Sequence, residues 1–238
     1  MAGRAPSDRW TEADGPAGPL LIAWGLAGVF AVTDSTDPAE LAWWVGERLG
    51  RSIEGHEPLP RAWADAVERA LAGEPAEDLL LDLSGVPVLE AEALRAARTI
   101  PFGEARPYAW VAREIGRPRA VRAVGTAMAR TPVPFLVPCH RVIRSDGHVG
   151  DYGAGGAVEK RAMLRLEGVD PDELDMLADR GIRYLGDLAA SRFCYPTCAR
   201  VRALPADARI AVKRAEIGFA AGLAPCDACR PVVGSPFA

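Results

Sequence analysis

Apolar and polar positions follow different periods along this 238-residue chain. In its first part, an apolar run with a glycine bend at residues 20–32 is typical of paired strands, and residues 79–83 indicate a further strand. Apolar residues at helical spacing predict helices over residues 39–49 and 59–71. Residues 1–18 are rich in Gly, Pro and Ala without a period, so we expect a frayed leader there. These elements predict a small mixed α/β domain.

In the middle of the chain the pattern of apolar and polar residues becomes typical of helices. Apolar spacing, with Gly and Pro as breakers, predicts helices over residues 90–99, 107–115, 119–129 and 158–166. The second and third of these are joined by Gly116-Arg117-Pro118, and arginines follow on the third. This is the layout of a helix-turn-helix, with a plain helical hairpin as the alternative. An apolar run at residues 133–137 predicts a short buried strand that leads into Pro138-Cys139-His140-Arg141-Val142.

A cysteine directly before a histidine suggests a reactive thiol. A nearby proton acceptor can turn the Cys139 thiol into a nucleophilic thiolate. The alternative for an isolated pair is a small buried hydrophobe beside a hydrogen-bonded histidine, because free cysteine is among the most buried residue types. The surrounding residues must decide between the two.

The remaining four cysteines lie in the last 45 residues and form two close pairs. Cys194 and Cys198 are separated from Cys226 and Cys229 by 27 residues. An odd total of five cysteines, clustered in this way, does not resemble a disulfide framework. Two close pairs suit a tetrahedral zinc-thiolate site, with reduced cysteines in a small core as the alternative. An acidic helix at residues 170–180 would connect this cysteine-bearing part to the rest.

Charge is distributed unevenly along the chain. The net charge of −4 argues weakly against nucleic-acid binding, but residues 101–168 carry a net +5 and residues 181–238 a net +4. Residues 1–100 carry −9 and residues 169–180 carry −4. The two basic blocks could face a polyanion, and ordinary solvated charge is the alternative. No apolar run is long enough to span a bilayer and no signal-peptide layout precedes one, so we expect a cytoplasmic protein that contacts no membrane.

A set of spaced motifs in residues 100–167 favours the interpretation of Cys139 as a nucleophile. In order, the motifs are Ile100-Pro101-Phe102-Gly103, Tyr108, Arg122-Ala123-Val124-Gly125, Pro138-Cys139-His140-Arg141-Val142, Gly150-Asp151-Tyr152, Lys160 and Glu167. Together they resemble the O6-alkylguanine-DNA alkyltransferase family, also called methylated-DNA–protein-cysteine S-methyltransferases, over residues 86–168. The first 85 residues fit the ribonuclease-H-like N-terminal domain of that family only in length and strand pattern.

The resemblance implies a single-turnover DNA repair enzyme. Cys139 would take the alkyl group from O6-alkylguanine, with O4-alkylthymine as a further candidate substrate, and would stay alkylated. His140 would act as its general base through a bridging water, oriented by Glu167. Tyr108 would give a proton to guanine N3 as the base departs. No cofactor would be needed for this transfer.

The resemblance also implies how DNA is bound. The partner would be double-stranded DNA with an alkylated guanine, whose nucleotide must leave the base stack to be reached. Arg122 would fill the vacated space as a wedge. Further DNA contacts would come from Arg119, Ala123, Gly125 and Arg141. The alkylated base would be bound by Tyr152, Gly153 and Val142. Thr131 departs from the family, which usually has an asparagine at this position. We expect the protein to be a monomer.

The cysteine-rich tail resembles the zinc domain of Ada-type adaptive-response proteins. The similar residues are Phe193-Cys194-Tyr195-Pro196-Thr197-Cys198 and Pro225-Cys226-Asp227-Ala228-Cys229-Arg230-Pro231. Two interpretations follow. Zinc-bound Cys194 would accept a methyl group from a DNA phosphotriester, or the zinc module would be structural and add a basic DNA contact. We prefer the second.

The expected fold is therefore α+β and is built from five parts. They are a flexible leader (1–18), a ribonuclease-H-like domain (19–85), a helical, winged-helix-like alkyltransferase domain (86–168), a connector helix (169–180) and an Ada-like zinc module (181–238). Two other functional hypotheses remain: a non-catalytic protein that binds alkyl lesions or DNA, and, less favoured, a papain-like Cys-His hydrolase.

Overall fold

The computed structural model describes residues 8–16, 18–153 and 156–234. Contacts divide the chain into two compact units. The first unit consists of Met1–Ala91 and Arg130–Pro138, and the second of Glu92–Ala129 and Cys139–Ala238. The division into five parts along the sequence stays a prediction. No helix among the described residues has both the length and the apolar composition that crossing a membrane requires.

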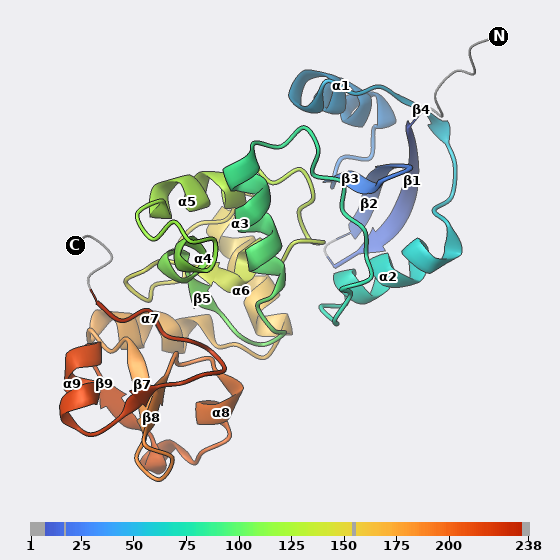
Figure 1. Cartoon of the computed structure of the whole chain (residues 1–238). Helices are drawn as coiled ribbons and strands as arrows, with labels where there is room; N and C mark the ends of the chain where they lie inside the picture. The colour runs from blue at the N-terminus through green and yellow to red at the C-terminus, as the bar shows by residue number, and fades with distance from the viewer. Residues whose placement is uncertain (1–7, 17, 154–155, 235–238) are drawn as a thin grey trace. The chain divides into compact units, whose positions relative to one another are not determined.

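A mixed sheet forms the centre of the first unit (Figure 1). Its strands are β1 (Asp8–Gly15), β2 (Gly18–Gly25), β3 (Gly28–Thr33) and β4 (Ile53–His56). They lie in the order β3-β2-β1-β4, antiparallel except for the parallel pair β1 and β4. The paired strands expected in residues 20–32 are confirmed. The expected leader is wrong over residues 8–15, which form β1, and β4 was not expected.

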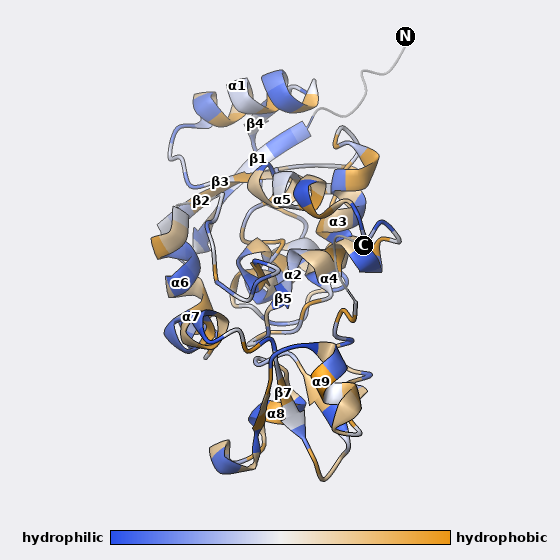
Figure 2. Cartoon of the chain, turned by 90° about the vertical axis from the view of Figure 1, so that its left-hand side faces the viewer, coloured by the Kyte–Doolittle hydropathy of each residue, from blue (hydrophilic) through white to orange (hydrophobic). Residues whose placement is uncertain are grey.

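Two helices accompany this sheet: α1 (Pro38–Leu49) and α2 (Arg61–Leu71). The Asp37 side chain caps α1 by accepting a hydrogen bond from the backbone N–H of Ala39 at 2.9 Å. Leu41 and Val45 of α1 pack on Phe30 and its neighbours in the sheet, which forms the core of the unit. In Figure 2, α1 mixes hydrophilic and hydrophobic residues along its length, as an amphipathic helix does. The strand expected at residues 79–83 is wrong, since only Leu81 makes a β-bridge, to Val29.

The segment Arg130–Pro138 returns to the first unit as a turn. The strand expected at residues 133–137 is wrong: Pro134 and Val137 form an isolated bridge across a turn in which Phe135 has φ = +68°. Pro134 within the run, and Pro132 and Pro138 on either side of it, lack the N–H groups that a ladder needs. The carbonyl of Pro132 accepts a hydrogen bond from Val32 at 2.8 Å, which ties the turn to β3. Thr131 accepts one from the N–H of Val133 at 3.3 Å.

Helices dominate the N-terminal half of the second unit. Their bounds are α3 (Val88–Arg98, which begins in the first unit), α4 (Tyr108–Glu114), α5 (Val121–Ala129), α6 (Gly156–Leu166) and α7 (Pro171–Asp179). All five were expected within two residues of these bounds. Two short parallel strands, β5 (Arg106–Pro107) and β6 (Val142–Ile143), join the start of α4 to the segment after Cys139. The core around them contains Ala105, Ile143, Val149, Leu164, Val169 and Leu174.

A second small sheet follows α7 in the same unit. Its strands are β7 (Tyr184–Asp187), β8 (Arg192–Cys194), β9 (Ile210–Val212) and β10 (Ala224–Pro225), in the order β10-β8-β7-β9. The short helices are α8 (Ala199–Arg202), the 3-10 turn η2 (Ala206–Ala208) and α9 (Ala215–Ala220). Figure 1 shows this part in orange and red. We call residues 181–234 the cysteine module.

Candidate active site and cysteine cluster

Cys139 begins the second unit's return segment and lies on a single 3-10 turn, η1 (Cys139–Arg141). Its side chain is buried, as are those of His140 and Arg141. The turn leads directly into β6, whose pairing with β5 places it beside the first residues of α4. Cys139 thus lies on a short, backbone-anchored turn.

Glu167, at the end of α6, binds His140 across the site. Its Oε1 lies 2.6 Å from His140 Nε2, and both side chains are almost fully buried. Burial alone would raise the pKa of Glu167, but hydrogen bonds from His140 and Arg141 outweigh it and lower that pKa. The carboxylate is therefore ionised and only accepts, so Nε2 carries the hydrogen. His140 Nδ1 is then a buried acceptor that has no hydrogen-bond partner among the described residues.

The imidazole itself is held in the neutral form. Burial lowers the pKa of His140, and the hydrogen bond and charge of Glu167 oppose that effect. The nearby cations Arg141 and Lys160 lower it further. A neutral histidine with a free lone pair on Nδ1 can accept a proton from a neighbouring thiol. The arrangement is that of a nucleophile, a base and an orienting carboxylate.

The position of Arg141 in the structure corrects the expectation that this residue contacts DNA. Its guanidinium is buried and donates to both carboxylate oxygens of Glu167, with Nε 2.8 Å from Oε2 and Nη2 2.9 Å from Oε1. Its Nη1 donates to the carbonyl of Ile100 at 2.8 Å. These bonds turn the side chain inward, so Arg141 fixes Glu167 instead of reaching a phosphate. The sequence analysis missed this role of Arg141, because no local sequence pattern indicates it.

Tyr108 and Lys160 approach the same place from α4 and α6. Burial, helped by the charges of Cys139 and Asp151, raises the pKa of Tyr108 to about 12, so its hydroxyl keeps the proton. Lys160 Nζ lies 5.8 Å from the Tyr108 ring centre and donates to the carbonyl of Val142 at 2.7 Å. Burial lowers the pKa of Lys160 to about 8, although the charges of Cys139 and Asp151 oppose this. Lys160 is one of the spaced motif residues, but the sequence analysis assigned it no role. Its position on the buried face of a helix is the sequence signal that could have pointed to one.

The expected DNA-contacting residues, Arg141 excepted, lie on or next to α5. Arg119 and Arg122 are exposed, while Ala123 and Gly125 are half-buried. A side chain added at Gly125 would meet open space, so this part of the helix is not covered by the second unit. α4 and α5 are joined by a turn in which Gly116 has φ = +69°, a conformation that favours glycine. The pair presents exposed positive charge on its second helix.

The expected base-binding residues take different places. Val142 is buried in β6 and its carbonyl holds Lys160. Tyr152 is buried with its ring edge-on to His140 at 6.4 Å between ring centres. At Gly153 a Cβ would come 2.7 Å from the carbonyl oxygen of Ala129, so only glycine allows this close approach to the end of α5. The next two residues of the glycine-rich loop lie outside the described residues.

The four cysteines of the cysteine module form one cluster. The sulfur atoms of Cys194, Cys198, Cys226 and Cys229 all lie within 4.8 Å of one another, and all four side chains are buried. Zinc-sulfur bonds of about 2.3 Å in a tetrahedron place sulfurs roughly 3.8 Å apart, which this spacing accommodates. The pKa of Cys198 is lowered because the Cys194 and Cys229 thiols donate hydrogen bonds to its sulfur. The donor set fits a zinc ion.

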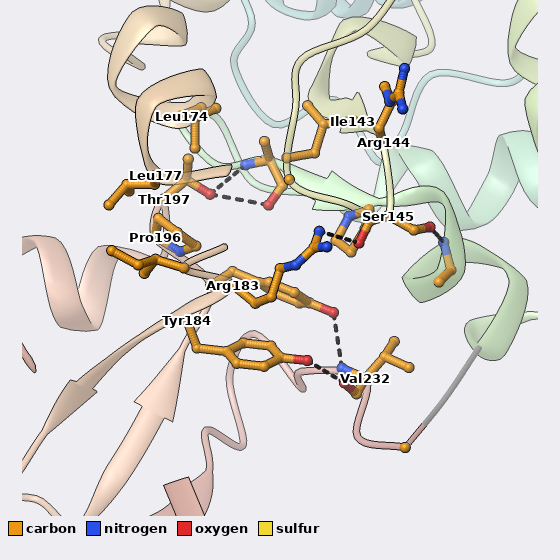
Figure 3. A pocket seen from close by; sticks show the side chains of 17 residues that line it. Ile143, Arg144, Ser145, Leu174, Leu177, Arg183, Tyr184, Pro196, Thr197 and Val232 are labelled. Carbon is orange, nitrogen blue, oxygen red and sulfur yellow. Dashed lines mark hydrogen bonds between the residues drawn. The ribbon is translucent and has the colours of Figure 1, made fainter. Parts of the chain in front are cut away.

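A cavity lies elsewhere in the second unit, between β6 and the cysteine module (Figure 3). Its walls include Ile143, Leu174, Tyr184 and Pro196. None of the expected site residues is among the described residues that line it. The cavity is thus separate from the site around Cys139.

Known proteins resemble this chain along most of its length. The family model described as the DNA-binding domain of 6-O-methylguanine DNA methyltransferase matches residues 89–169. The methylated-DNA–protein-cysteine methyltransferase of Mus musculus is 35% identical over 201 residues, which cover 78% of this chain and 92% of the mouse protein. The Mycobacterium tuberculosis protein of that name is 37% identical over 161 residues, covering 65% of this chain and 88% of that one. The chain belongs to the methylated-DNA–protein-cysteine methyltransferase family.

Solved structures agree with this membership. The Mycobacterium tuberculosis OGT in complex with DNA has a TM-score of 0.51 and 32% identity, and the match covers 70% of this chain and 98% of that one. The O6-methylguanine-DNA methyltransferase from Pyrococcus kodakaraensis has a TM-score of 0.52 at 27% identity, covering 68% and 99%. The chain thus has the mixed α/β fold of these methyltransferases. The family model ends at residue 169, before the cysteine module.

Proposed function

We propose that Cys139 accepts the alkyl group of O6-alkylguanine in double-stranded DNA, and O4-alkylthymine as a second substrate, in one irreversible turnover. The observation that carries the proposal is the buried His140–Glu167 pair beside Cys139, in a chain of the methylated-DNA–protein-cysteine methyltransferase family. Direct repair by transfer to a cysteine is the function of this family, and the geometry supplies the groups that it needs.

The transfer is a single displacement at the alkyl carbon. His140 Nδ1 takes the Cys139 proton through a bridging water, and Glu167 stabilises the imidazolium that forms. The thiolate then forms the carbon-sulfur bond while the bond from that carbon to guanine O6 breaks. Tyr108 donates its proton to guanine N3, so the base leaves neutral. Lys160, charged below its pKa of about 8, favours the thiolate. A thioether is a poor leaving group, which ends the cycle.

DNA binding is assigned to α4 and α5 as a helix-turn-helix. The exposed arginines of α5 and its start, Arg119 and Arg122, face the backbone and the base stack. Arg122 occupies the space of the rotated nucleotide, while Ala123 and Gly125 permit close approach. Tyr152, Gly153 and Val142 border the pocket for the rotated base. The inward bonds of Arg141 remove it from this set.

The cysteine module is assigned a structural zinc ion held by Cys194, Cys198, Cys226 and Cys229. Such an ion links two chain segments that lie far apart in sequence and so contributes to folding. Cys194 is 0% exposed, which favours the structural role over methyl acceptance from a phosphotriester, because an acceptor sulfur must be reached by the DNA. Its resemblance to the Ada-type zinc domain rests on the sequence motifs.

Three further assignments remain proposals. The first unit is ribonuclease-H-like, which the order β3-β2-β1-β4 with α1 between β3 and β4 supports. The protein acts as a monomer. It works in the cytoplasm, next to the DNA that it repairs.

The experiment that tests the function compares the wild type with Cys139→Ala. Both are incubated with duplex DNA containing one O6-methylguanine with a labelled methyl group. The wild type should take up the label, and Cys139→Ala should bind the same DNA without taking it up. Equal, tight lesion binding by both proteins with no label on either would instead identify a non-catalytic lesion-binding protein.

A further inference from the structure

The carboxylate of Glu167 is held from behind by backbone as well as by side chains. The N–H of Gly103 donates to Oε2 of Glu167 at 3.2 Å. Gly103 has φ = +71°, and Gly168, which follows Glu167, has φ = +72°. A Cβ at Gly103 would come 3.0 Å from the carbonyl oxygen of Glu167. The two glycine turns therefore lie side by side and fix where the carboxylate points.

One side chain of the cysteine module clamps both of these turns. Arg202, the last residue of α8, donates from Nη1 to the carbonyl of Gly103 at 2.8 Å and from Nη2 to the carbonyl of Gly168 at 2.8 Å. The planar fork of a guanidinium suits two parallel acceptors of this kind. The carbonyl of Arg202 accepts a hydrogen bond from Arg209 at 2.9 Å, which anchors the donor in its own module.

The start of α8 is attached to the same region by a second set of bonds. Thr197, adjacent to the ligand candidate Cys198, accepts from the N–H of Ala105 at 2.8 Å and donates to its carbonyl at 3.0 Å (Figure 3). Glu104 accepts from the N–H of Ala199 at 2.8 Å and pairs with Arg106, and both charged side chains are buried. Arg106 belongs to β5, which pairs with β6 after the Cys139 turn. The contact is thus directional and built from buried polar groups, unlike a loose linker.

We propose that the cysteine module is a brace for the active site, in which Arg202 is a positioning residue that holds Glu167, and through it His140, in the geometry needed for alkyl transfer. The inference rests on the proposed function, since it concerns the rate of that same transfer. It gives the module a role within the alkyl transfer reaction itself, distinct from DNA contact and from methyl acceptance. Among the residues that the structure describes, Arg202 hydrogen-bonds to Gly103, Gly168 and Arg209, none of which holds a reacting atom or is proposed to contact DNA.

Arg202→Ala in the full-length, zinc-loaded protein tests the brace. Arg200→Ala is the matched control, because Arg200 lies on the same short helix and pairs only with Asp227 among the described residues. The single-turnover rate is measured at saturating duplex DNA with one O6-methylguanine, together with DNA affinity and bound zinc. Arg202→Ala should lose about tenfold or more in rate, since small misplacements of reacting groups are costly. Its DNA affinity and zinc content should stay within about twofold of the wild type.

Two readouts distinguish positioning from a general structural effect. The titratable groups around His140 are Glu167, Arg141, Lys160 and Tyr152, together with the adjacent Cys139. A loosened Glu167 raises the pKa of His140 less, so the acidic limb of the rate-against-pH profile should move to lower pH in Arg202→Ala. Arg202→Lys can reach only one of the two carbonyls. Its transfer rate and its acidic limb should therefore lie between those of the wild type and those of Arg202→Ala. The ring-proton resonance of His140, one of three histidines, should also shift in Arg202→Ala and not in Arg200→Ala.

The outcomes separate the two claims. If the wild type methylates Cys139 while Arg202→Ala has the wild-type rate, pH profile and His140 resonance, the brace is refuted and the proposed function stands. If Arg202→Ala and Arg200→Ala lose rate equally with no change of pH profile, the positioning role is also refuted. If the wild type itself transfers no methyl group, the proposed function fails, and the His140 resonance alone still shows whether Arg202 positions Glu167.

Discussion

At the scale of single residues, Glu167 determines the chemistry of the site. Its carboxylate accepts hydrogen bonds from the His140 ring, the Arg141 guanidinium and the Gly103 backbone. Because it is ionised and fully engaged, it orients His140 so that the acceptor nitrogen remains available to Cys139. Three kinds of donor converge on one buried side chain, so removing its charge should affect both rate and stability.

Replacing the carboxylate by an amide, Glu167→Gln, tests this residue. The hydrogen bond and charge of Glu167 raise the pKa of His140 against burial, so the amide lets that pKa fall and disfavours the imidazolium. The single-turnover rate should drop by about 10²-fold or more, and the acidic limb of its pH profile should move to lower pH, because His140 then stays neutral to lower pH. Arg141 loses its buried partner, which should cost about 3 kcal/mol in urea unfolding. Glu159→Gln, on the same helix, is the control; an unchanged pH profile for Glu167→Gln would contradict the assignment.

At the scale of elements, α5 is the helix that we propose to contact DNA. Arg122 is exposed on it, and the helix is not covered by the rest of its unit at Gly125. Rotating a nucleotide out of a duplex breaks stacking and pairing, whereas a single strand has less to break. The wedge residue should therefore matter most where a duplex must be opened.

Arg122→Ala should lower the transfer rate from duplex DNA by about tenfold and from a single-stranded oligonucleotide by much less. The comparison is made by single-turnover kinetics on the two substrates with the same O6-methylguanine. Arg95→Ala removes an equal charge from an exposed position of α3 and should change neither rate substantially. Equal losses on both substrates would show that Arg122 contributes only charge.

Elements with a clear period were predictable from the sequence, and irregular ones were not. α1 and α7 have apolar spacing, an Asp cap and a first-turn proline, and both formed as expected. β1 was missed because its alternating charged residues lie within a Gly- and Pro-rich start. The turn around Phe135 was predicted as a strand because its composition is apolar, although its prolines exclude a regular ladder.

The residues of the candidate site likewise divide into those that the sequence could predict and those that it could not. Cys139, His140, Tyr108 and Glu167 could be named as candidates because they belong to spaced motifs. The roles of Arg141 and Arg202 were not, since each depends on partners distant in sequence, such as Gly103, 99 residues from Arg202. A contact of this kind leaves no periodic or compositional trace.

At the scale of the whole molecule, the proposed brace requires the cysteine module to be folded. Metal ligands far apart in sequence form a site only in the folded state, so metal binding adds to folding stability. Removing zinc with a chelator should expose Cys194, Cys198, Cys226 and Cys229 to a thiol reagent and lower Tm by about 5 °C or more, as 1 kcal/mol corresponds to roughly 2–4 °C at this size. Added zinc should reverse both changes. Unchanged thiol reactivity and Tm would contradict a structural metal.

The chain as a whole is proposed to act once, at one sulfur atom. The most direct measurement is the mass of the intact protein after incubation with excess duplex DNA containing O6-methylguanine, followed by peptide mapping. We predict an increase of one methyl group per protein, located on the peptide with Cys139, and no increase on the peptides with the four clustered cysteines. An unmodified Cys139 under excess substrate, or a methyl group found only elsewhere, would contradict the proposal.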